Sequence, residues 1–557
     1  MRSAHPILLV LAVVVSGVAQ ALISAPASWI WLHPFSWIPA FWAFDQLRGG
    51  RAFRYGWLCG AAGQAAIFYW LVDTITVFSN LPWVVAIIIL FAYSALFGFY
   101  VGIFAWGFSI VRRMSGAWWP VGLAAWFCAC EYLNPQLFPY FQGVAWYQQP
   151  WIFLITAITG VAGVSFLVML ANGVLFGFLQ ARFGQAHGEV EESSDGAATA
   201  PSLAPVRPAI AFAVALVLSL VYCQVRLRAI DAAEAEAPSI TLASIQSNQD
   251  VFKRRAMMRQ SKTAIADDQV ELLKETLEER PDIDAFVLPE GALQGRPDWP
   301  RNHRIRRFVK ETGKELWTGG SSNKKGPDGR RLWFNSAFRI HGDAESDKRY
   351  DKNVLLPFGE YMPGASILPF LKKIQGVGNY QPGDGIIVYD AVQSARFTFL
   401  ICYEAIISRY VRRAVKEGAN LLVNVSYDAW YGDTACPHQF LMLVVLQSAQ
   451  NGVPTARSAT TGISAFADAR GRFLSKSPLF ERTALVQEVK LVRMPSLYTQ
   501  LGDWLAWVCI LGVFGAWVRR GRELTPDGWR ARWPLVLIAF AVLVNAVFVF
   551  GGIGPIG

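Results

Sequence analysis

Cys402 is the residue in this chain best suited to nucleophilic chemistry, and two charged residues stand in similar positions. It follows the apolar run 399–401, so it lies at the end of a predicted buried strand. Glu290 comes soon after the apolar run 285–288, and Lys352 precedes a Pro- and Gly-containing segment. Because α/β domains place reactive groups at strand ends, these three side chains are candidates for one site.

Each of the three residues also has an ordinary interpretation. A glutamate after a strand is usually a solvated turn residue, a lysine beside a loop usually faces water, and a cysteine at a strand end is more often packed than reactive. Together, however, they hold the parts for acyl transfer. A thiolate is a strong nucleophile, a carboxylate can accept and return its proton, and an ammonium group can stabilise an oxyanion.

The segment that contains these residues, 238–492, reads as a water-exposed α/β domain. Short β-rich runs alternate with amphipathic helical patterns, and this alternation is typical of α/β folds. The expected strands are 239–247, 285–288, 315–319, 334–340, 396–401 and 420–425, the expected helices are 260–279 and 408–418, and a hairpin is expected over 462–474.

The rest of the chain is strongly apolar. Only 17% of all residues are charged, against about 25% in soluble proteins, and the deficit falls in 1–227 and 498–557. Since a bilayer core requires about 20 apolar residues in a helix, we expect seven membrane spans in the first region and two in the second. They are 6–23, 29–44, 55–78, 83–111, 118–133, 151–179, 208–225, 501–518 and 534–550.

The placement of arginines predicts the orientation of this polytopic membrane domain. Arginines gather in the loops 45–54, 112–117 and 519–533, whereas 79–82 and 134–150 hold neither Lys nor Arg. Cationic loops stay in the cytoplasm, so the α/β domain is expected on the outer face. The polar, aperiodic segment 186–206 is expected to be a disordered cytoplasmic loop.

Charge and cysteine usage argue against other classes of protein. The net charge of +10 is concentrated in membrane loops, and the α/β segment has no basic stripe interleaved with aromatics, which disfavours nucleic-acid binding. The 7 cysteines and 6 histidines form no CxxC pair and no zinc-type spacing. The sequence therefore predicts neither a metal site nor a cofactor.

Longer motifs around the three candidates are similar to those of the apolipoprotein N-acyltransferases, membrane members of the carbon–nitrogen hydrolase (nitrilase) superfamily. The segment from Lys352 through LPFGEYMP at 356–363 and ICYE at 401–404 carry the closest resemblance. Further matching motifs are TGG at 318–320, FNSAF at 334–338, SYDAWYGD at 426–433, PHQ at 437–439, RSATTGIS at 457–464, LYTQLGDWLAW at 497–507, FRYGWLCG at 53–60 and TGVAGVSFLVMLAN at 159–172.

This resemblance implies an αββα sandwich for the α/β domain and a two-step exchange of an acyl chain. Glu290 would be the general base, Lys352 would stabilise the tetrahedral intermediate, and Cys402 would carry the acyl group as a thioester. The donor would be a phospholipid, and the acceptor would be the α-amine of a diacylglyceryl-cysteine lipoprotein. The enzyme would be a monomer in the bacterial inner membrane.

Four further residues match family positions near this triad. Glu360, Tyr403 and Glu404 match residues that support the triad or its loops, and Trp430 matches an aromatic residue that shapes the substrate entrance. The chain also departs from the family pattern, most notably at Leu288, usually Trp, and at Tyr427 and Thr460, both usually Asn. Other departures are Cys436, Phe440, Asn134 and the ninth span. They bear on acceptor choice or efficiency more than on the reaction type.

Several alternatives remain open on the sequence. A membrane-tethered amidase would use water as the acceptor, and an inactive lipid- or lipoprotein-binding protein would fit the departures at Tyr427 and Thr460. A transporter would need ionisable residues inside its spans, where only Asp73 and Glu131 qualify. The flanking motifs do not support a papain-like pair of Cys402 with His438.

Overall fold

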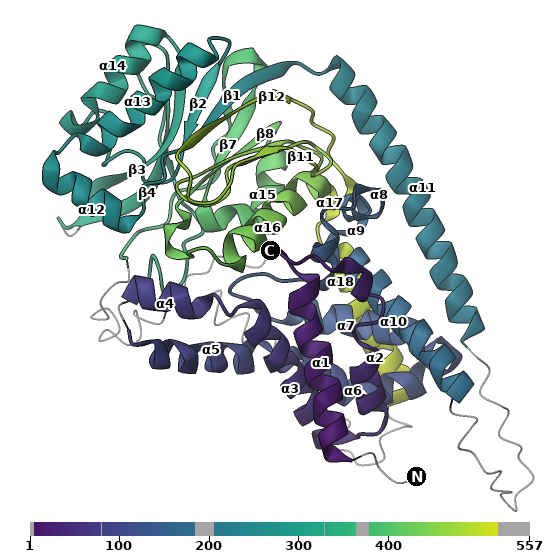
Figure 1. Ribbon diagram of the computed structural model, residues 1–557. Helices are drawn as coiled ribbons and strands as arrows, with labels where there is room; N and C mark the ends of the chain where they lie inside the picture. The colour runs from purple at the N-terminus through teal and green to yellow at the C-terminus, as the bar shows by residue number, and fades with distance from the viewer. Residues whose placement is uncertain (1–4, 80, 184–204, 328, 364–377, 522–557) are drawn as a thin grey trace, which may run out of the picture. The chain divides into compact units, whose positions relative to one another are not determined.

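The protein was analysed as a computed structural model that describes residues 5–79, 81–183, 205–327, 329–363 and 378–521 (Figure 1). It divides into two compact units. One is helical and includes Val84–Gln224, and the other is an α/β unit that includes Val225–Gly502. The expected loop 186–206 and the expected span 534–550 lie wholly or almost wholly outside the described residues.

The helices that precede the first strand vary widely in length. They are α1 (Pro6–Ile23), α2 (Ile38–Asp45), α3 (Gly49–Ile67), α4 (Leu71–Ser79), α5 (Trp83–Phe97), α6 (Phe99–Ser115), α7 (Trp119–Leu133), α8 (Pro150–Phe153), α9 (Thr156–Thr159), α10 (Val161–Phe183) and α11 (Val206–Glu236), with 3₁₀ turns η1 (Ile30–Leu32), η2 (Gly116–Trp118) and η3 (Gln142–Trp146). After the α/β unit, α18 (Trp504–Ala516) completes the helical unit.

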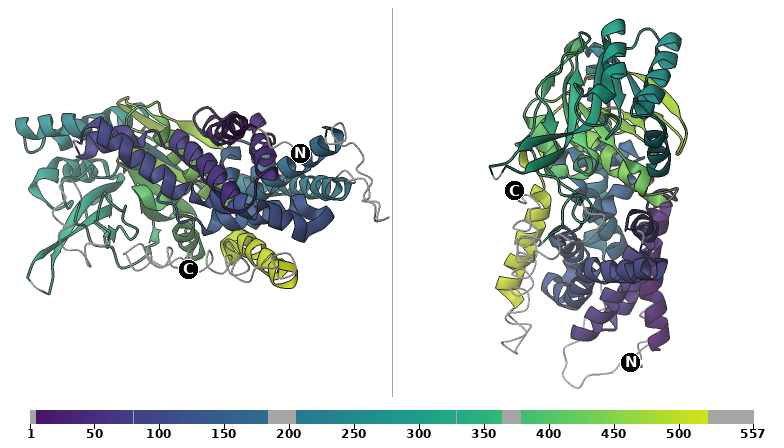
Figure 2. Two further views of the ribbon diagram at one scale, coloured as in Figure 1. Left: turned by 90° about the horizontal axis from the view of Figure 1, so that it is seen from below. Right: turned by 90° about the vertical axis from the view of Figure 1, so that its left-hand side faces the viewer.

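The helical unit is held together by interlocked aromatic side chains. In it α1 packs on α3, α3 on α6, α6 on α7, and α7 on α10 and α18 (Figures 1 and 2). The ring centroid of Phe127 lies 5.1 Å from that of Trp37 and 5.3 Å from that of Phe104, and both contacts are edge-to-face. Such contacts add to the area that large rings bury.

Several of these helices could cross a membrane. Among the described residues, the segments Pro6–Ile23, Trp83–Leu133, Val161–Phe183 and Val206–Glu236 are long and apolar enough, and the bent pair Gly49–Ile67 with Leu71–Val77 is a further candidate. The apolar helices fit a multi-pass membrane protein.

Three of the expected spans are clearly broken. Residues 29–44 form η1 and the short α2, residues 55–78 form parts of α3 and α4, which meet at a bend of 55°, and residues 151–179 form α8, α9 and part of α10. Pro39 lies at the start of α2, where a proline is tolerated because the first helical N–H groups have no partner within the helix. The spans were predicted from apolar composition, and composition alone does not show where a helix is interrupted.

In the part of the chain that the structure describes, the α/β unit contains twelve strands in two sheets. The strands are β1 (Ser239–Gln246), β2 (Ala285–Leu288), β3 (Glu315–Lys325), β4 (Arg331–Ile340), β5 (Tyr350–Asp351), β6 (Tyr389–Asp390), β7 (Arg396–Ile401), β8 (Leu421–Ser426), β9 (Thr455–Ala459), β10 (Ala465–Ala467), β11 (Phe473–Lys476) and β12 (Thr483–Lys490). The helices are α12 (Val251–Gln260), α13 (Ala264–Glu279), α14 (His303–Thr312), α15 (Ser408–Lys416), α16 (Ala435–Asn451) and α17 (Leu497–Leu501).

Both sheets have parallel strands at their centre. The first has the order β12-β1-β2-β3-β4-β5 and the second β11-β10-β9-β8-β7-β6. In the first sheet β1, β2 and β3 run parallel, and in the second β7, β8 and β9 do. The carboxyl ends of neighbouring parallel strands meet at one edge of a sheet, where α/β proteins place functional groups.

The sheets pack face to face between helices. Trp317 of β3 stacks on Phe397 of β7 at 4.0 Å between ring centroids, in an apolar layer that both sheets share. On the other side of the first sheet, Phe286 packs with Phe308 of α14 and Leu273 of α13. With α15 and α16 beside the second sheet (Figure 1), the predicted α/β sandwich is confirmed, and β10 with β11 forms the expected hairpin.

Candidate active site

Two of the three candidates follow parallel central strands, and the third follows an edge strand. Glu290 lies two residues after β2, Cys402 directly after β7, and Lys352 directly after β5. Although they come from both sheets, the charges of Glu290 and Lys352 act on the Cys402 thiol. The structure therefore brings the three predicted side chains into one electrostatic environment.

The backbone turns sharply at Cys402. Its φ is +51°, which is rare for a residue other than glycine, and it begins the 3₁₀ turn η8 (Cys402–Ile406). The residue is only 7% exposed. Burial raises the pKa of the thiol to about 12, with a further increase from Glu290 and an opposing effect from Lys352. The resting group is thus a neutral thiol, which requires a base before it can attack.

We expect this raised pKa to be visible in the alkylation of Cys402 by iodoacetamide. The alkylation rate should keep rising between pH 8 and pH 10, because only the thiolate reacts and its fraction is far from saturation. Peptide mass spectrometry at each pH would measure this rate. A cysteine introduced by Ser261→Cys at an exposed position is the control, and its rate should level off near pH 9. The same early plateau at Cys402 would contradict the prediction.

Lys352 lies at the centre of a network of buried charges. It is 1% exposed, and its Nζ lies 2.7 Å from Glu360 Oε2. Burial alone lowers the pKa of Lys352, but Glu360, Glu290 and Cys402 outweigh that effect and raise the pKa above its usual value. The ammonium group is therefore permanently charged and fixed in position, as an oxyanion-stabilising group must be.

Asn335 joins the two carboxylates of the site. Its Nδ2 donates to Glu290 Oε1 at 2.6 Å and to Glu360 Oε1 at 2.8 Å. Its backbone carbonyl accepts from the N–H of Lys352 at 2.8 Å. The side-chain amide of this β4 residue thus sets the separation of both carboxylates, and its backbone carbonyl holds the Lys352 backbone. The sequence indicated Asn335 only as part of the FNSAF motif, without a role.

Glu290 receives a second hydrogen bond from the opposite sheet. The backbone N–H of Tyr427, just after β8, donates to Glu290 Oε2 at 2.9 Å. Burial raises the pKa of Glu290, Lys352 lowers it, and Glu360 raises it again. A carboxylate with a raised pKa is a better proton acceptor than an ordinary surface glutamate, which suits a general base.

Glu404 connects the Cys402 turn to the Lys352 loop. It is fully buried and accepts from the N–H of Ile401 at 2.8 Å, of Asn353 at 2.5 Å and of Val354 at 3.0 Å, and from the hydroxyl of Tyr350 at 2.8 Å. Each carboxylate oxygen receives two of these bonds, so the side chain positions both loops.

Glu404→Gln is therefore expected to destabilise the protein although it keeps the side chain's shape. The NH₂ group of the glutamine would replace one oxygen that now accepts two hydrogen bonds, so these two donors would lose their acceptor. We expect the free energy of unfolding to fall by about 3 kcal/mol. A lower midpoint of thermal unfolding, followed by tryptophan fluorescence, would measure this. Glu311→Gln, at a surface glutamate that pairs with Arg307, is the matched control and should leave the midpoint nearly unchanged. Equal midpoints for the two variants would refute this positioning role.

The remaining predicted residues lie beside this network. Tyr403 is buried, and burial raises its pKa. Trp430 is half-buried, and its ring lies 5.7 Å from that of Tyr427. Asp428, which lies between Tyr427 and Trp430 in the sequence, forms a buried ion pair with Arg457 at 2.6 Å, and this pair secures the loop that follows β8. Sequence reasoning did not single out Asp428 or Arg457, although both lie in the motifs noted above.

Two glycines of the matched motifs allow close approaches around the site. A Cβ on Gly319 would lie 2.5 Å from the Cα of Glu290, and one on Gly462 would lie 2.0 Å from Asp428 Oδ2. Either contact is far shorter than van der Waals distance, so any larger residue would displace the segments that carry these carboxylates. This explains why glycine occurs in TGG and in RSATTGIS.

The departures from the family pattern leave the described contacts intact. Tyr427 contacts Glu290 through its backbone N–H, which any residue except proline provides. Leu288 is fully buried in the core beside α13 and α14. Thr460 donates its backbone N–H to the carbonyl of Ser426 at 3.1 Å.

Among the described residues there is no group of three His, Cys, Asp or Glu side chains that could hold a metal ion.

Comparisons with known proteins agree with this architecture. Residues 241–498 match the carbon–nitrogen hydrolase family, and residues 16–174 match the apolipoprotein N-acyltransferase N-terminal domain. The α/β unit thus has the fold of a carbon–nitrogen hydrolase. The match to a solved structure of a carbon–nitrogen hydrolase from Helicobacter pylori G27 covers 45% of this chain and 90% of that protein, at 17% sequence identity and a TM-score of 0.35.

Full-length relatives define the family more narrowly. The apolipoprotein N-acyltransferase of Geobacter metallireducens is 32% identical over 521 residues, which cover 90% of this chain and 92% of the relative. That of Bdellovibrio bacteriovorus is 26% identical, covering 85% of this chain and 86% of the relative. The chain belongs to the apolipoprotein N-acyltransferase family, as the sequence motifs predicted.

Proposed function

We propose that this protein transfers an acyl chain from a membrane phospholipid to the α-amine of a diacylglyceryl-cysteine at the N-terminus of a lipoprotein, with Cys402 as the covalent carrier. The observation that carries the proposal is the connected network of Lys352, Glu360, Asn335 and Glu290 beside a buried thiol. Relatives named apolipoprotein N-acyltransferase support the choice of lipoprotein as acceptor.

The first step forms a thioester. Glu290 accepts the thiol proton of Cys402, and the sulfur attacks the ester carbonyl of the phospholipid. The charge that develops on the carbonyl oxygen is stabilised by Lys352. When the C–O ester bond breaks, Glu290 returns the proton to the departing oxygen, and a lysophospholipid leaves. The acyl chain then remains on Cys402 as a thioester.

The second step forms an amide. The amine of the acceptor attacks the thioester carbonyl, and Glu290 accepts a proton from the nitrogen. Breaking the C–S bond regenerates the sulfur, which recovers this proton as a thiol. Because a thioester is reactive towards amines, no external energy source is needed. Both substrates are lipids, which accounts for the apolar helices in the same chain.

We further propose that the enzyme works as a monomer in the bacterial inner membrane with its α/β unit on the outer face. Support comes from the arginines in the loops 45–54, 112–117 and 519–533, which favour a cytoplasmic location for these loops and hence an outer location for the α/β unit. Lipoprotein acceptors are modified on that outer face in this proposal, so the site and its acceptor share one compartment.

Mass spectrometry of the full-length protein tests the proposal. After incubation with a phospholipid, an acyl adduct is expected on Cys402 and on no residue of a Cys402→Ser variant. A synthetic diacylated lipopeptide should discharge the adduct, whereas water alone should not. An adduct lost to water would instead identify a membrane-tethered hydrolase, and the absence of any adduct would identify an inactive binding protein.

A further inference from the structure

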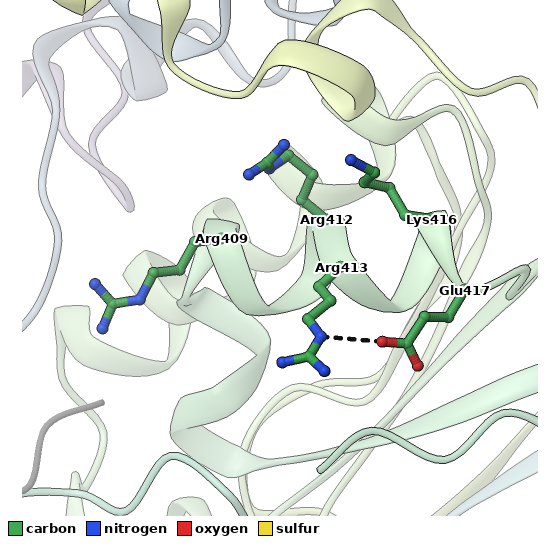
Figure 3. A pocket seen from close by; sticks show the side chains of 5 residues that line it. All are labelled: Arg409, Arg412, Arg413, Lys416 and Glu417. Atoms are coloured by element: carbon green, nitrogen blue, oxygen red, sulfur yellow. Dashed lines mark hydrogen bonds and ion pairs between the residues drawn. The ribbon is translucent and has the colours of Figure 1, made fainter. Parts of the chain in front are cut away.

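The helix α15 presents a strongly cationic pocket that the proposed reaction does not use. Arg409, Arg412, Arg413 and Lys416 line it together with one carboxylate, Glu417 (Figure 3). The space measures about 370 Å³. The opposite side of the helix is apolar and buried, through Val411, Ala414 and Val415. The cationic side chains therefore all project from the outward face.

Four cationic side chains and one carboxylate line this pocket. Arg413 pairs with Glu417 at 3.0 Å, and their side chains are 67% and 39% exposed. Within the described part of the chain, Arg412 donates to the backbone carbonyls of Thr499 and Gln500, at 3.4 Å each. On the equally basic α14, Arg304, Arg306 and Arg307 each have a carboxylate partner, so cations and carboxylates are more evenly matched there than in the lining of the α15 pocket. A surplus of cations around one cavity favours an anionic ligand.

The chain places this pocket close to the start of an apolar helix. The Arg412 guanidinium lies against Gly502, about 3.1 Å from the position of a Cβ on that residue. The apolar helix α18 begins at Trp504, and two residues span at most about 7 Å. An apolar helix that enters a bilayer begins at the level of the lipid headgroups. In the membrane arrangement expected from the sequence, in which α18 belongs to a span, Arg412 is within reach of headgroups.

At its other end α15 packs against η8, the turn that begins with Cys402. Burial raises the pKa of Tyr403, which directly follows Cys402, and the positive charge of Arg409 opposes this increase. Arg409 is thus near enough to Tyr403 to act on it electrostatically. One face of α15 connects the residue after the nucleophile with the residues that precede α18.

We propose that the α15 pocket binds the phosphate of an anionic phospholipid headgroup. Arginine and lysine side chains bind phosphate through charge-assisted hydrogen bonds, and cationic clusters beside a membrane helix attract anionic lipids. This site is separate from the thiol chemistry, and its existence does not depend on the proposed acyl transfer.

Chemical protection of the arginines tests the proposal on the full-length protein in neutral detergent. Phenylglyoxal labelling of Arg409, Arg412 and Arg413, read by peptide mass spectrometry, should fall at least threefold with phosphatidylglycerol but not with phosphatidylcholine. Inorganic phosphate at the same phosphate concentration should protect less than twofold. Equal protection by inorganic phosphate would instead identify a site for free phosphate, and equal protection by both lipids would overturn the proposal.

Substitution of the two most exposed cations provides the second measurement. In Arg413→Gln/Lys416→Gln, phosphatidylglycerol binding, counted as lipid adducts by native mass spectrometry, should weaken about fivefold for each cation removed. The matched control is Arg301→Gln/Lys310→Gln, which removes one exposed arginine and one exposed lysine from the same unit. Equal losses in both double variants would show a general charge effect and overturn the proposal. Acyl loading of Cys402 is scored separately, so the two proposals can fail independently.

Discussion

Glu290→Gln is expected to slow acyl loading of Cys402 about a thousandfold, because a positioned general base contributes about 10² to 10⁴ to such a step. The thiol has a pKa of about 12, so its spontaneous ionisation near neutral pH is too small to replace the base. The glutamine cannot accept the proton. Its one oxygen can still accept the N–H of Tyr427, whose bond to Glu290 measures 2.9 Å, while its NH₂ group would face the amide donor of Asn335. Time-resolved mass spectrometry of the acyl adduct would measure the rate.

The pH dependence separates loss of the base from loss of structure. Glu290 must be ionised to accept a proton, and burial raises its pKa. The wild-type rate should therefore rise with pH through that raised pKa and then level off. In Glu290→Gln this plateau should vanish, and the residual rate should increase with thiol ionisation across the alkaline range. Glu345→Gln, at a residue that is 79% exposed, should behave as the wild type. A retained plateau in Glu290→Gln would rule out this role.

Lys352→Met is expected to damage both activity and stability. Removal of an oxyanion-stabilising group costs about 10² to 10³ in rate. It also leaves Glu360, whose carboxylate lies 2.7 Å from the Lys352 ammonium, without its buried counter-charge. Removal of one partner of a buried ion pair typically costs about 3 to 5 kcal/mol. The acyl-adduct assay and thermal unfolding would measure the two effects.

The stability loss in Lys352→Met should depend on pH. Lys352 lowers the pKa of Glu290, so its removal raises that pKa further above the unfolded value. A carboxyl group with a raised folded-state pKa binds its proton more tightly when folded, so stability is retained at low pH and declines as the pH rises. The difference in unfolding midpoint between Lys352→Met and wild type should thus be larger at pH 8 than at pH 5. Lys348→Met, at an exposed lysine, should show no such dependence, and a pH-independent difference in Lys352→Met would contradict the argument.

Local patterns in the sequence were sufficient for the elements that carry the candidate residues. The strands expected at 285–288 and 396–401 coincide with β2 and β7. Short runs of apolar and β-branched residues with turn residues around them carry their own signal. The motifs also indicated the family and the sandwich fold. The membrane placement and the roles of the site residues stay predictions.

Elements without a local signal were not predicted. Nearly every residue of α16 is buried, so it has no polar face to produce a helical periodicity. The strand β12 pairs with β1 from the opposite end of the unit, and such long-range pairing leaves no mark in a short window. In the helical unit, apolar runs predicted continuous spans at 29–44, 55–78 and 151–179 where the helices are broken.

The candidate site shows the same division between local and long-range information. The residue types Cys402, Glu290 and Lys352 follow from the sequence and its motifs. That Asn335 donates to two carboxylates, that Cys402 has a positive φ, and that Glu404 points inward became evident only in the folded chain. The reason is physical: the bonds from Asn335 to Glu290 and from the N–H of Asn353 to Glu404 join segments far apart in sequence, and their geometry exists only once both sheets have paired and packed.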